Sequence, residues 1–174
     1  MRPSALLPLL LATSACAVSM GPPRTKPEAL RVALFDRDGA SVGAVVLTAD
    51  SAGMTLAFDV HDLSPGAHGV HVHAIGRCER PDFLSAGPHL DVGGHAHGLD
   101  NPAGHHLGDL PNLVVGPDGR ATATLRLQPR DGKFTPRTLL DSDGSAIIIH
   151  AGPDDGHTDP SGNSGARIAC GIVA

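Results

Sequence analysis

Histidine is concentrated in one part of this sequence. The 174-residue chain contains 11 histidines, and eight of them lie between His68 and His106. Imidazole is the commonest metal ligand among protein side chains. The concentration of histidine therefore predicts a metal-binding site.

The segment His71-Val72-His73 has the spacing of a strand. Side chains on a strand repeat every second residue on the same face. His71 and His73 should therefore point the same way, with Val72 turned into the core, and two imidazoles on a rigid strand can share one ion. Taken alone, such a pair is more often two exposed polar residues on a sheet face.

A second set of ligand-type residues lies on predicted loop. Its members are three histidines and one carboxylate, namely His89, His97, His106 and Asp109. Three nitrogens and one oxygen suit a tetrahedral, closed, structural zinc site. The alternative is a solvated loop with adventitious metal binding, and we adopt it for His95 and His105, to which we assign no role.

Three residues near the C-terminus extend the cluster. His150 ends the apolar run Ala146–Ile149. A buried histidine is more often a core residue with satisfied hydrogen bonds, but two imidazoles from one strand leave a metal site incomplete, which favours a ligand. Asp154 follows closely, and a carboxylate beside a ligand histidine can fix its tautomer. For Arg167, the default interpretation is a surface salt bridge.

Short strand patterns separated by turns must position these residues. We predict strands over Leu30–Phe35, Ser41–Thr48, Met54–Val60, Leu113–Val115, Ala121–Leu127, Ala146–His150 and Ala166–Val173. Asp118-Gly119 is typical of a hairpin turn between two of them. We find no helix of ordinary length, so the pattern predicts an all-β antiparallel sandwich or barrel. Residues 75–111 and 151–165 lack a strand pattern, and long loops of this kind are usually functional or disordered.

Composition narrows the classes of protein. The length suits one domain, and the core must be aliphatic because the chain has no Trp, no Tyr and four Phe. The formal net charge of −5 disfavours nucleic acid as a partner. No apolar run is long enough to span a bilayer.

The first 17 residues are typical of an export signal, with Arg2 before the short apolar stretch Ala5–Ala12. Cleavage at Ala15-Cys16-Ala17 would remove the cysteine. We favour the other interpretation, that Thr13–Cys16 resembles a bacterial lipobox and Cys16 becomes a lipidated N-terminus attached to a membrane. Residues 18–27 should form a flexible tether, with the folded domain spanning residues 28–174.

Two cysteines remain for the exported domain, Cys78 and Cys170. In an oxidising compartment such a pair is usually a disulfide, worth about 4–5 kcal/mol on the chain-entropy model. Two buried thiols and two soft copper ligands are the alternatives.

Five motifs together resemble one family. They are Gly66–His73 (GAHGVHVH), Gly76–Cys78, Pro81–His89, His106–Asn112 and Gly162–Gly171. On these motifs the chain resembles the copper–zinc superoxide dismutases of the exported bacterial type, over residues 28–174. The resemblance implies a Greek-key antiparallel β-barrel or sandwich, immunoglobulin-like, with two long functional loops.

The resemblance also implies a role for each site residue. The copper ligands would be His71, His73, His89 and His150, and the zinc ligands would be His89, His97, His106 and Asp109. His89 would bridge both metals and pass a proton, Asp154 would link His71 to His97, and His68 would support the site without binding metal. Arg167 would attract the anion, and the disulfide between Cys78 and Cys170 would help to place it.

The implied activity is dismutation of superoxide to dioxygen and hydrogen peroxide, in defence of the periplasm or cell envelope, with one copper and one zinc per subunit. The chain could be a monomer or a homodimer. The alternative is a non-catalytic periplasmic copper-binding or copper-handling protein on the same scaffold. One departure is notable: residues 151–165 contain no Lys or Arg, where relatives often carry guiding charges, so we expect Arg167 to be the main steering group within these loops.

Overall fold

The computed structural model describes residues 29–50, 53–129 and 134–174. The predicted signal peptide, the tether and the lipidation candidate Cys16 lie outside the described residues. Within those described, no helix is long and apolar enough to cross a membrane.

The described chain is built from short strands. They are β1 (Ala29–Asp36), β2 (Ser41–Asp50), β3 (Gly53–Val60), β4 (Gly66–His68), β5 (Val70–His73), β6 (Leu113–Val115), β7 (Ala121–Leu127), β8 (Ser145–His150) and β9 (Arg167–Val173). Two single 3-10 turns, Leu84–Ala86 and Pro136–Thr138, are the helical elements of the described residues. The predicted strands are confirmed, with ends that differ by no more than two residues.

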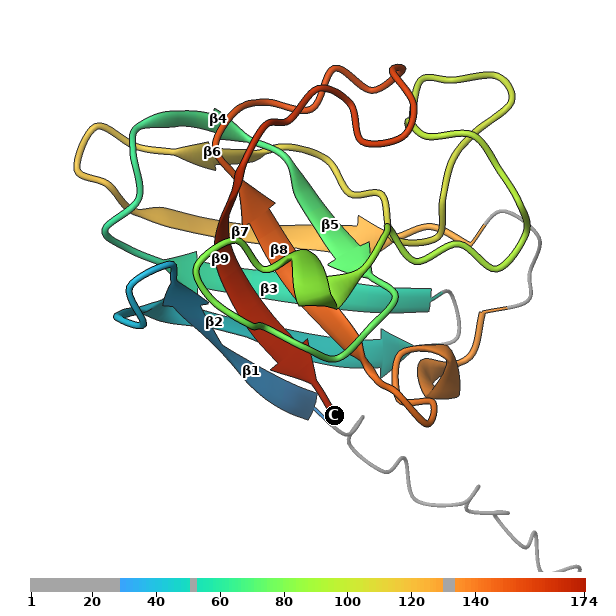
Figure 1. Ribbon diagram of the computed structural model, residues 1–174, viewed down its shortest axis with the longest axis horizontal. Coiled ribbons are helices and arrows are strands. Elements are labelled where there is room, and N and C mark those ends of the chain that lie inside the picture. Colours follow the sequence, from blue (N-terminus) through green and yellow to red (C-terminus); the bar gives the residue numbers. More distant parts are fainter. Residues whose placement is uncertain (1–28, 51–52, 130–133) are drawn as a thin grey trace, which may run out of the picture.

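The strands form one large curled antiparallel sheet and one small pair (Figure 1). The order in the large sheet is β5-β8-β9-β1-β2-β3-β7, and β4 pairs with β6. Chain order and spatial order differ, because the connections from β3 to β5 and from β7 to β8 each cross from one side of the sheet to the other. These crossings give the predicted Greek-key arrangement, and they bring β5 beside β8.

β5 ends at His73 and β8 begins at Ser145, so the pairing of these two strands is a contact between distant parts of the chain. Their register sets His71 opposite Ile148 and His73 opposite Ala146. The two histidine-bearing strands are thereby held side by side at one edge of the sheet.

The turn at Asp118-Gly119 forms as predicted, but its flanking strands do not pair with each other. The amide of Gly116 donates to the carbonyl of Arg120 at 2.8 Å, which closes the turn. Beyond it, β6 pairs with β4 and β7 pairs with β3. The expected hairpin is therefore wrong, because the two strands enter different sheets.

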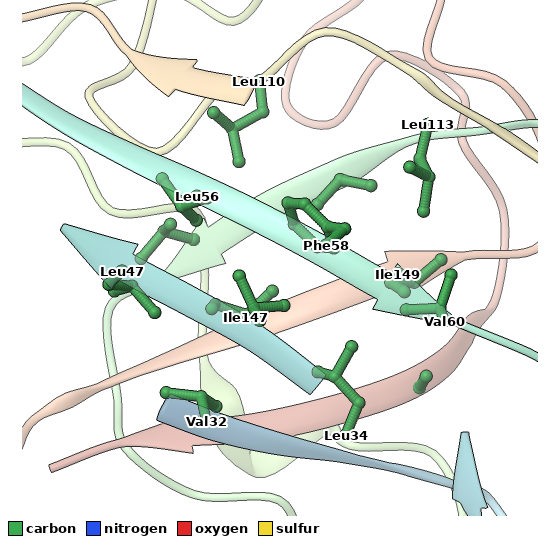
Figure 2. Close-up of a cluster of buried hydrophobic side chains, with 14 of the residues drawn as sticks. Val32, Leu34, Leu47, Leu56, Phe58, Val60, Leu110, Leu113, Ile147 and Ile149 are labelled. Atoms are coloured by element: carbon green, nitrogen blue, oxygen red, sulfur yellow. The ribbon is translucent and has the colours of Figure 1, made fainter. Parts of the chain in front are cut away.

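Alternating residues of the strands fill an aliphatic core (Figure 2). In β3, Leu56, Phe58 and Val60 are buried, while the residues between them lie outside the core. From the opposite side, Ile147 and Ile149 of β8 pack into the same cluster. This alternation is what half-buried strands require.

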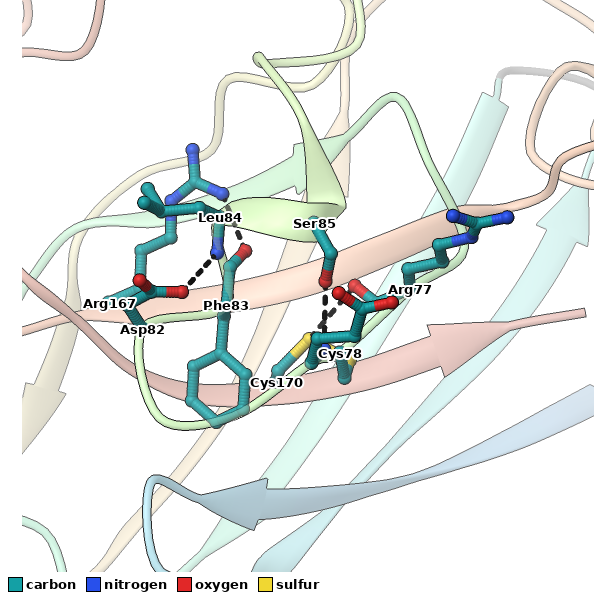
Figure 3. The surroundings of a disulfide bond; sticks show 9 residues. Arg77, Cys78, Asp82, Phe83, Leu84, Ser85, Arg167 and Cys170 are labelled. Atoms are coloured by element: carbon teal, nitrogen blue, oxygen red, sulfur yellow. Dashed lines mark hydrogen bonds between the residues drawn. A yellow bond between two sulfur atoms is a disulfide. The ribbon is translucent and has the colours of Figure 1, made fainter.

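The outer face of β8 is also buried, under a loop. Ile148 packs with Phe83, Ala86 and Cys170 in a second cluster outside the main core. Phe83 and Ala86 belong to the loop that follows β5, and the Cys78–Cys170 disulfide ties this loop to β9 (Figure 3). Because loops cover this face of the sheet, side chains that point outward from β5 and β8 are shielded from solvent.

Candidate metal centre

Four histidines meet on the covered outer face of β5 and β8. His71 and His73 come from β5, His150 ends β8, and His89 comes from the long loop. Their relative exposures are 0%, 1%, 3% and 7%, in that order. One nitrogen from each lies within 4.8 Å of the others. The prediction that His71 and His73 share a face is confirmed, with Val72 buried in the core.

Hydrogen bonds select which nitrogen of each ring faces the centre. His73 Nδ1 donates to Gly87 O at 2.8 Å, and His150 Nδ1 donates to Gly165 O at 3.1 Å. His71 Nε2 donates to Asp154 Oδ2 at 2.5 Å. An imidazole that donates through one nitrogen presents a lone pair on the other.

Those remaining nitrogens have no hydrogen-bond partner among the described residues. They are His71 Nδ1, His73 Nε2, His89 Nε2 and His150 Nε2. A buried polar atom without a partner costs free energy and calls for an explanation. Four converging, unpaired imidazole nitrogens fit a bound metal ion, and nitrogen ligands suit copper.

A second group converges on one oxygen of Asp109. Asp109 Oδ1 lies 2.9 Å from Nδ1 of His89, 3.1 Å from Nδ1 of His97 and 3.3 Å from Nδ1 of His106. The backbone amides of Gly98 and His106 donate to its other oxygen, Oδ2, at 2.9 and 3.0 Å. Oδ1 is therefore aimed at the three nitrogens, as a three-nitrogen, one-oxygen zinc set requires.

His71 also lies close to this second group. One ligand atom from each of His71, His89, His97 and Asp109 lies within 4.8 Å of the others. We nevertheless place His106 in this set rather than His71. The Nε2 of His71 is already bonded to Asp154 and its Nδ1 belongs to the first group, whereas His106 Nδ1 is buried without a hydrogen-bond partner in the described residues.

His89 belongs to both groups. Its Nδ1 faces Asp109 and its Nε2 faces the first set of histidines. Its ring stacks on the ring of His71 with centroids 3.8 Å apart. One imidazole with a nitrogen on each side can join two ions.

Asp154 connects the two groups from the loop after β8. Its carboxylate accepts from Nε2 of His71 and, at 3.0 Å, from Nε2 of His97. Asn112 holds the backbone of Asp154 on both sides, through its N–H at 2.8 Å and its carbonyl at 2.9 Å. The predicted link between His71 and His97 is thus present in the structure.

The pKa values of His73, His89 and His150 move in the opposite direction to that of His97. Burial lowers the pKa of His73 to about 2 and those of His89 and His150 to about 4. Burial also opposes the charged form of His97, but hydrogen bonds to Asp109 and Asp154 raise its pKa to about 9. The first group is therefore neutral and ready for a cation, while His97 holds a proton between two carboxylates.

Arg167 begins β9 and is held beside the first group. Its guanidinium donates to Phe83 O at 2.7 Å (Figure 3) and to Gly87 O at 2.8 Å. Gly87 O is the same carbonyl that accepts from His73. The salt bridge that we took as the default for Arg167 is replaced by these carbonyls, because the disulfide holds their loop against β9.

His68 supports the site without facing it. Its Nδ1 contacts His150 O at 2.6 Å and its Nε2 contacts Ser64 O at 2.8 Å. Both nitrogens are engaged, so neither can bind metal. His95 contacts Asp91, and His105 Nδ1 contacts His106 O.

Sequence reasoning missed the groups that orient the ligands. The carbonyls of Gly87 and Gly165 select the nitrogens of His73 and His150, and no side-chain pattern marks a carbonyl. Gly162 is another such position, with φ at +63° and no room for a Cβ, which would lie 2.0 Å from Asp154 Oδ1. Only glycine lets the loop pass this close to Asp154.

Comparison with known proteins agrees with this geometry. The family described as "Copper/zinc superoxide dismutase (SODC)" matches residues 41–173. The Superoxide dismutase-like protein YojM of Bacillus subtilis is 44% identical over 145 residues, 82% of this chain and 74% of that protein. A Superoxide dismutase [Cu-Zn] of Caulobacter vibrioides is 44% identical over 139 residues, 78% of this chain and 80% of that protein.

Solved structures show the same fold. A double mutant of a SOD-like protein from Bacillus subtilis superposes with a TM-score of 0.77 at 44% identity, covering 82% of this chain and 95% of that one. The Cu/Zn superoxide dismutase from Brucella abortus gives a TM-score of 0.67 at 29% identity, covering 84% of this chain and 100% of that one.

Proposed function

The chain belongs to the copper/zinc superoxide dismutase family, and from that premise we propose a role for each residue of its metal centre. It is a superoxide dismutase, an oxidoreductase that uses copper and zinc. We propose that one copper ion is held by His71, His73, His89 and His150. The zinc ion is then held by His89, His97, His106 and Asp109.

The observation that carries this proposal is the set of buried imidazole nitrogens without hydrogen-bond partners. Nδ1 of His71 and Nε2 of His73, His89 and His150 have no partner among the described residues, and these four histidines each offer a nitrogen within 4.8 Å of the others. In a metal-free fold these nitrogens would be an uncompensated cost. A copper ion satisfies all four.

Bound copper would supply the redox chemistry, which is the exchange of one electron with each of two superoxide anions. The protein supplies the rest. The guanidinium of Arg167 stays charged at working pH and holds the anion beside His73. His89 Nε2 faces the first group and, when it is not engaged as a ligand, could hold a proton and pass it to superoxide as that anion is reduced.

The second group has a structural task. Four protein ligands would close the coordination of zinc and leave no open position for catalysis. Zinc would also pin residues 89–109 onto β5, where Asp109 forms an isolated bridge with His71. His89 is thereby positioned from both sides.

We also propose that the protein is exported and protects the cell envelope. The support is the signal-like sequence of residues 1–17, with Cys16 as a candidate lipid anchor, together with the disulfide between Cys78 and Cys170, since disulfides persist in oxidising compartments. Mass spectrometry of the mature N-terminus tests the lipid anchor.

One measurement tests the activity. Protein loaded with copper and zinc, with its disulfide formed, should consume superoxide in a stopped-flow assay. His89→Ala should bind copper without the spectroscopic signature of a bridged centre and should turn over slowly, whereas His61→Gln, away from both groups of ligands, serves as the matched control. Absence of turnover in the fully metallated wild type would leave the copper-handling alternative in its place.

A further inference from the structure

A small surface pocket lies beside Arg167. Its volume is about 180 Å³, and it is lined by Arg37, Asp82, Leu84, Gly165, Ala166 and Arg167. Gly165 is the residue whose carbonyl orients His150. The pocket is therefore at the rim of the first group of histidines, on the side where Arg167 lies.

Arg37 reaches this pocket from the turn between β1 and β2. The turn is firmly built, because Asp36 Oδ1 accepts from the amides of Asp38 and Ala40 at 3.0 and 2.8 Å. Arg37 Nε donates to Pro81 O at 2.9 Å. Its terminal nitrogens make no hydrogen bond and no ion pair with the described residues, so the charge of Arg37 faces the pocket and solvent.

Arg37 determines the sign of the net charge in the pocket lining. Asp82 is an exposed carboxylate in the same pocket, and it interacts electrostatically with Arg167. Figure 3 shows Asp82 beside Arg167. Arg167 and Asp82 alone would cancel, whereas Arg37 gives the lining two positive charges against one negative charge.

The loop formed by residues 151–165 supplies no positive charge from Lys or Arg to attract an anion. Residues 151–165 contain no Lys or Arg and three Asp, and the whole chain carries a formal charge of −5. An approaching anion is repelled by this background unless a local positive field opposes it. Arg167 and Arg37 are the two cations in the pocket lining.

We propose that Arg37 is a second steering residue, which attracts superoxide toward Arg167 and offsets the charge of Asp82. This role rests on the proposed function. It makes the β1–β2 turn part of the anion's approach, although that turn lies far from every ligand in the sequence.

The test compares the second-order rate constant for superoxide across ionic strengths in the metallated enzyme. Steering charges change association rates by about 10-fold to 1,000-fold in total, so removing one of two should lower the low-salt rate constant by about 3-fold to 30-fold. We expect this loss for Arg37→Gln, with a flatter salt dependence. Arg167→Gln serves as the reference variant and should lower the rate constant more than Arg37→Gln does.

Three further variants separate charge from structure. Arg37→Lys should restore most of the rate, because it keeps the charge without the Nε bond to Pro81. Asp82→Asn should raise the low-salt rate. Arg31→Gln in β1 changes the net charge equally, six residues and about 20 Å away along the chain, and should have little effect.

The proposal is overturned if Arg37→Gln matches Arg31→Gln, or if Arg37→Lys is as slow as Arg37→Gln. Azide binding to the copper-loaded variants, followed by visible absorption, gives a second readout: Arg37→Gln should weaken it, and equal affinity would contradict the proposal. A wild type that binds azide but does not turn over superoxide would refute the proposed function while still testing Arg37.

Discussion

The disulfide between Cys78 and Cys170 should dominate the stability of the metal-free protein. The two cysteines are separated by 92 residues. Breaking the bond frees the loop after β5 from β9 without removing any side chain. We propose to compare the oxidised metal-free protein with the same protein after reduction, and with the Cys78→Ala/Cys170→Ala variant.

The size of the effect follows from the loop that the bond closes. For a loop of this length, the chain-entropy relation gives about 4.6 kcal/mol at room temperature. For a domain of this size, 1 kcal/mol corresponds to a change of about 2–4 °C in the melting temperature. Reduction should therefore lower the melting temperature by about 9–18 °C.

Urea denaturation measures the free energy of unfolding directly, and calorimetry measures the melting temperature. The reduced protein and the double variant should lose similar amounts. A loss below about 1 kcal/mol would refute the reasoning, since it would mean that the unfolded chain gains little freedom when the bond is opened.

Reduction should also affect the position of Arg167. The carbonyls that hold its guanidinium belong to Phe83 and Gly87 in the tied loop. In the metallated double variant we expect a lower rate with superoxide, while copper remains bound through the histidines.

Three other predictions concern the ligands. Asp154→Asn should weaken zinc binding by about 10–100-fold, because one amide cannot accept from both His71 and His97; a chelator competition that shows no change would contradict this. Zinc binding at pH 7 should release at least one proton, since the pKa of His97 is raised to about 9, whereas copper binding should release almost none, since the pKa values of His73 and His150 are lowered to about 2 and 4; calorimetry in two buffers measures both. The free energy of unfolding of the metal-free protein should fall as the pH drops from about 6.5 to 4, by up to about 1.4 kcal/mol per pH unit for each such neutral histidine, because the unfolded chain takes up protons there and the fold does not; a flat urea series would exclude it.

Much of the site could be predicted from local spacing. The two-residue period of a strand places His71 and His73 on one face and Val72 in the core, and the structure confirms it. The long loops were predicted because residues 75–111 and 151–165 lack any period. The motifs of the resemblance supplied the remaining candidate ligands and supported the distant His150.

Local patterns failed where pairing is non-local. The turn at Asp118-Gly119 can be predicted from two residues. The pairing of β6 with β4 and of β7 with β3 depends on strands that are distant in the sequence. The position of Arg37 also could not be predicted from local patterns. In the sequence it is an ordinary turn residue, and only the fold places it in the same pocket lining as Arg167.

The sequence by itself predicted which residues could hold metal, because ligand chemistry belongs to residue types and their spacing. Only the tertiary structure decided which nitrogen each histidine presents. That choice depends on the carbonyls of Gly87 and Gly165 and on the carboxylate of Asp154, which the fold brings from separate loops. A neutral imidazole carries a proton on one nitrogen and a lone pair on the other, and a hydrogen-bond acceptor beside one nitrogen fixes the proton there.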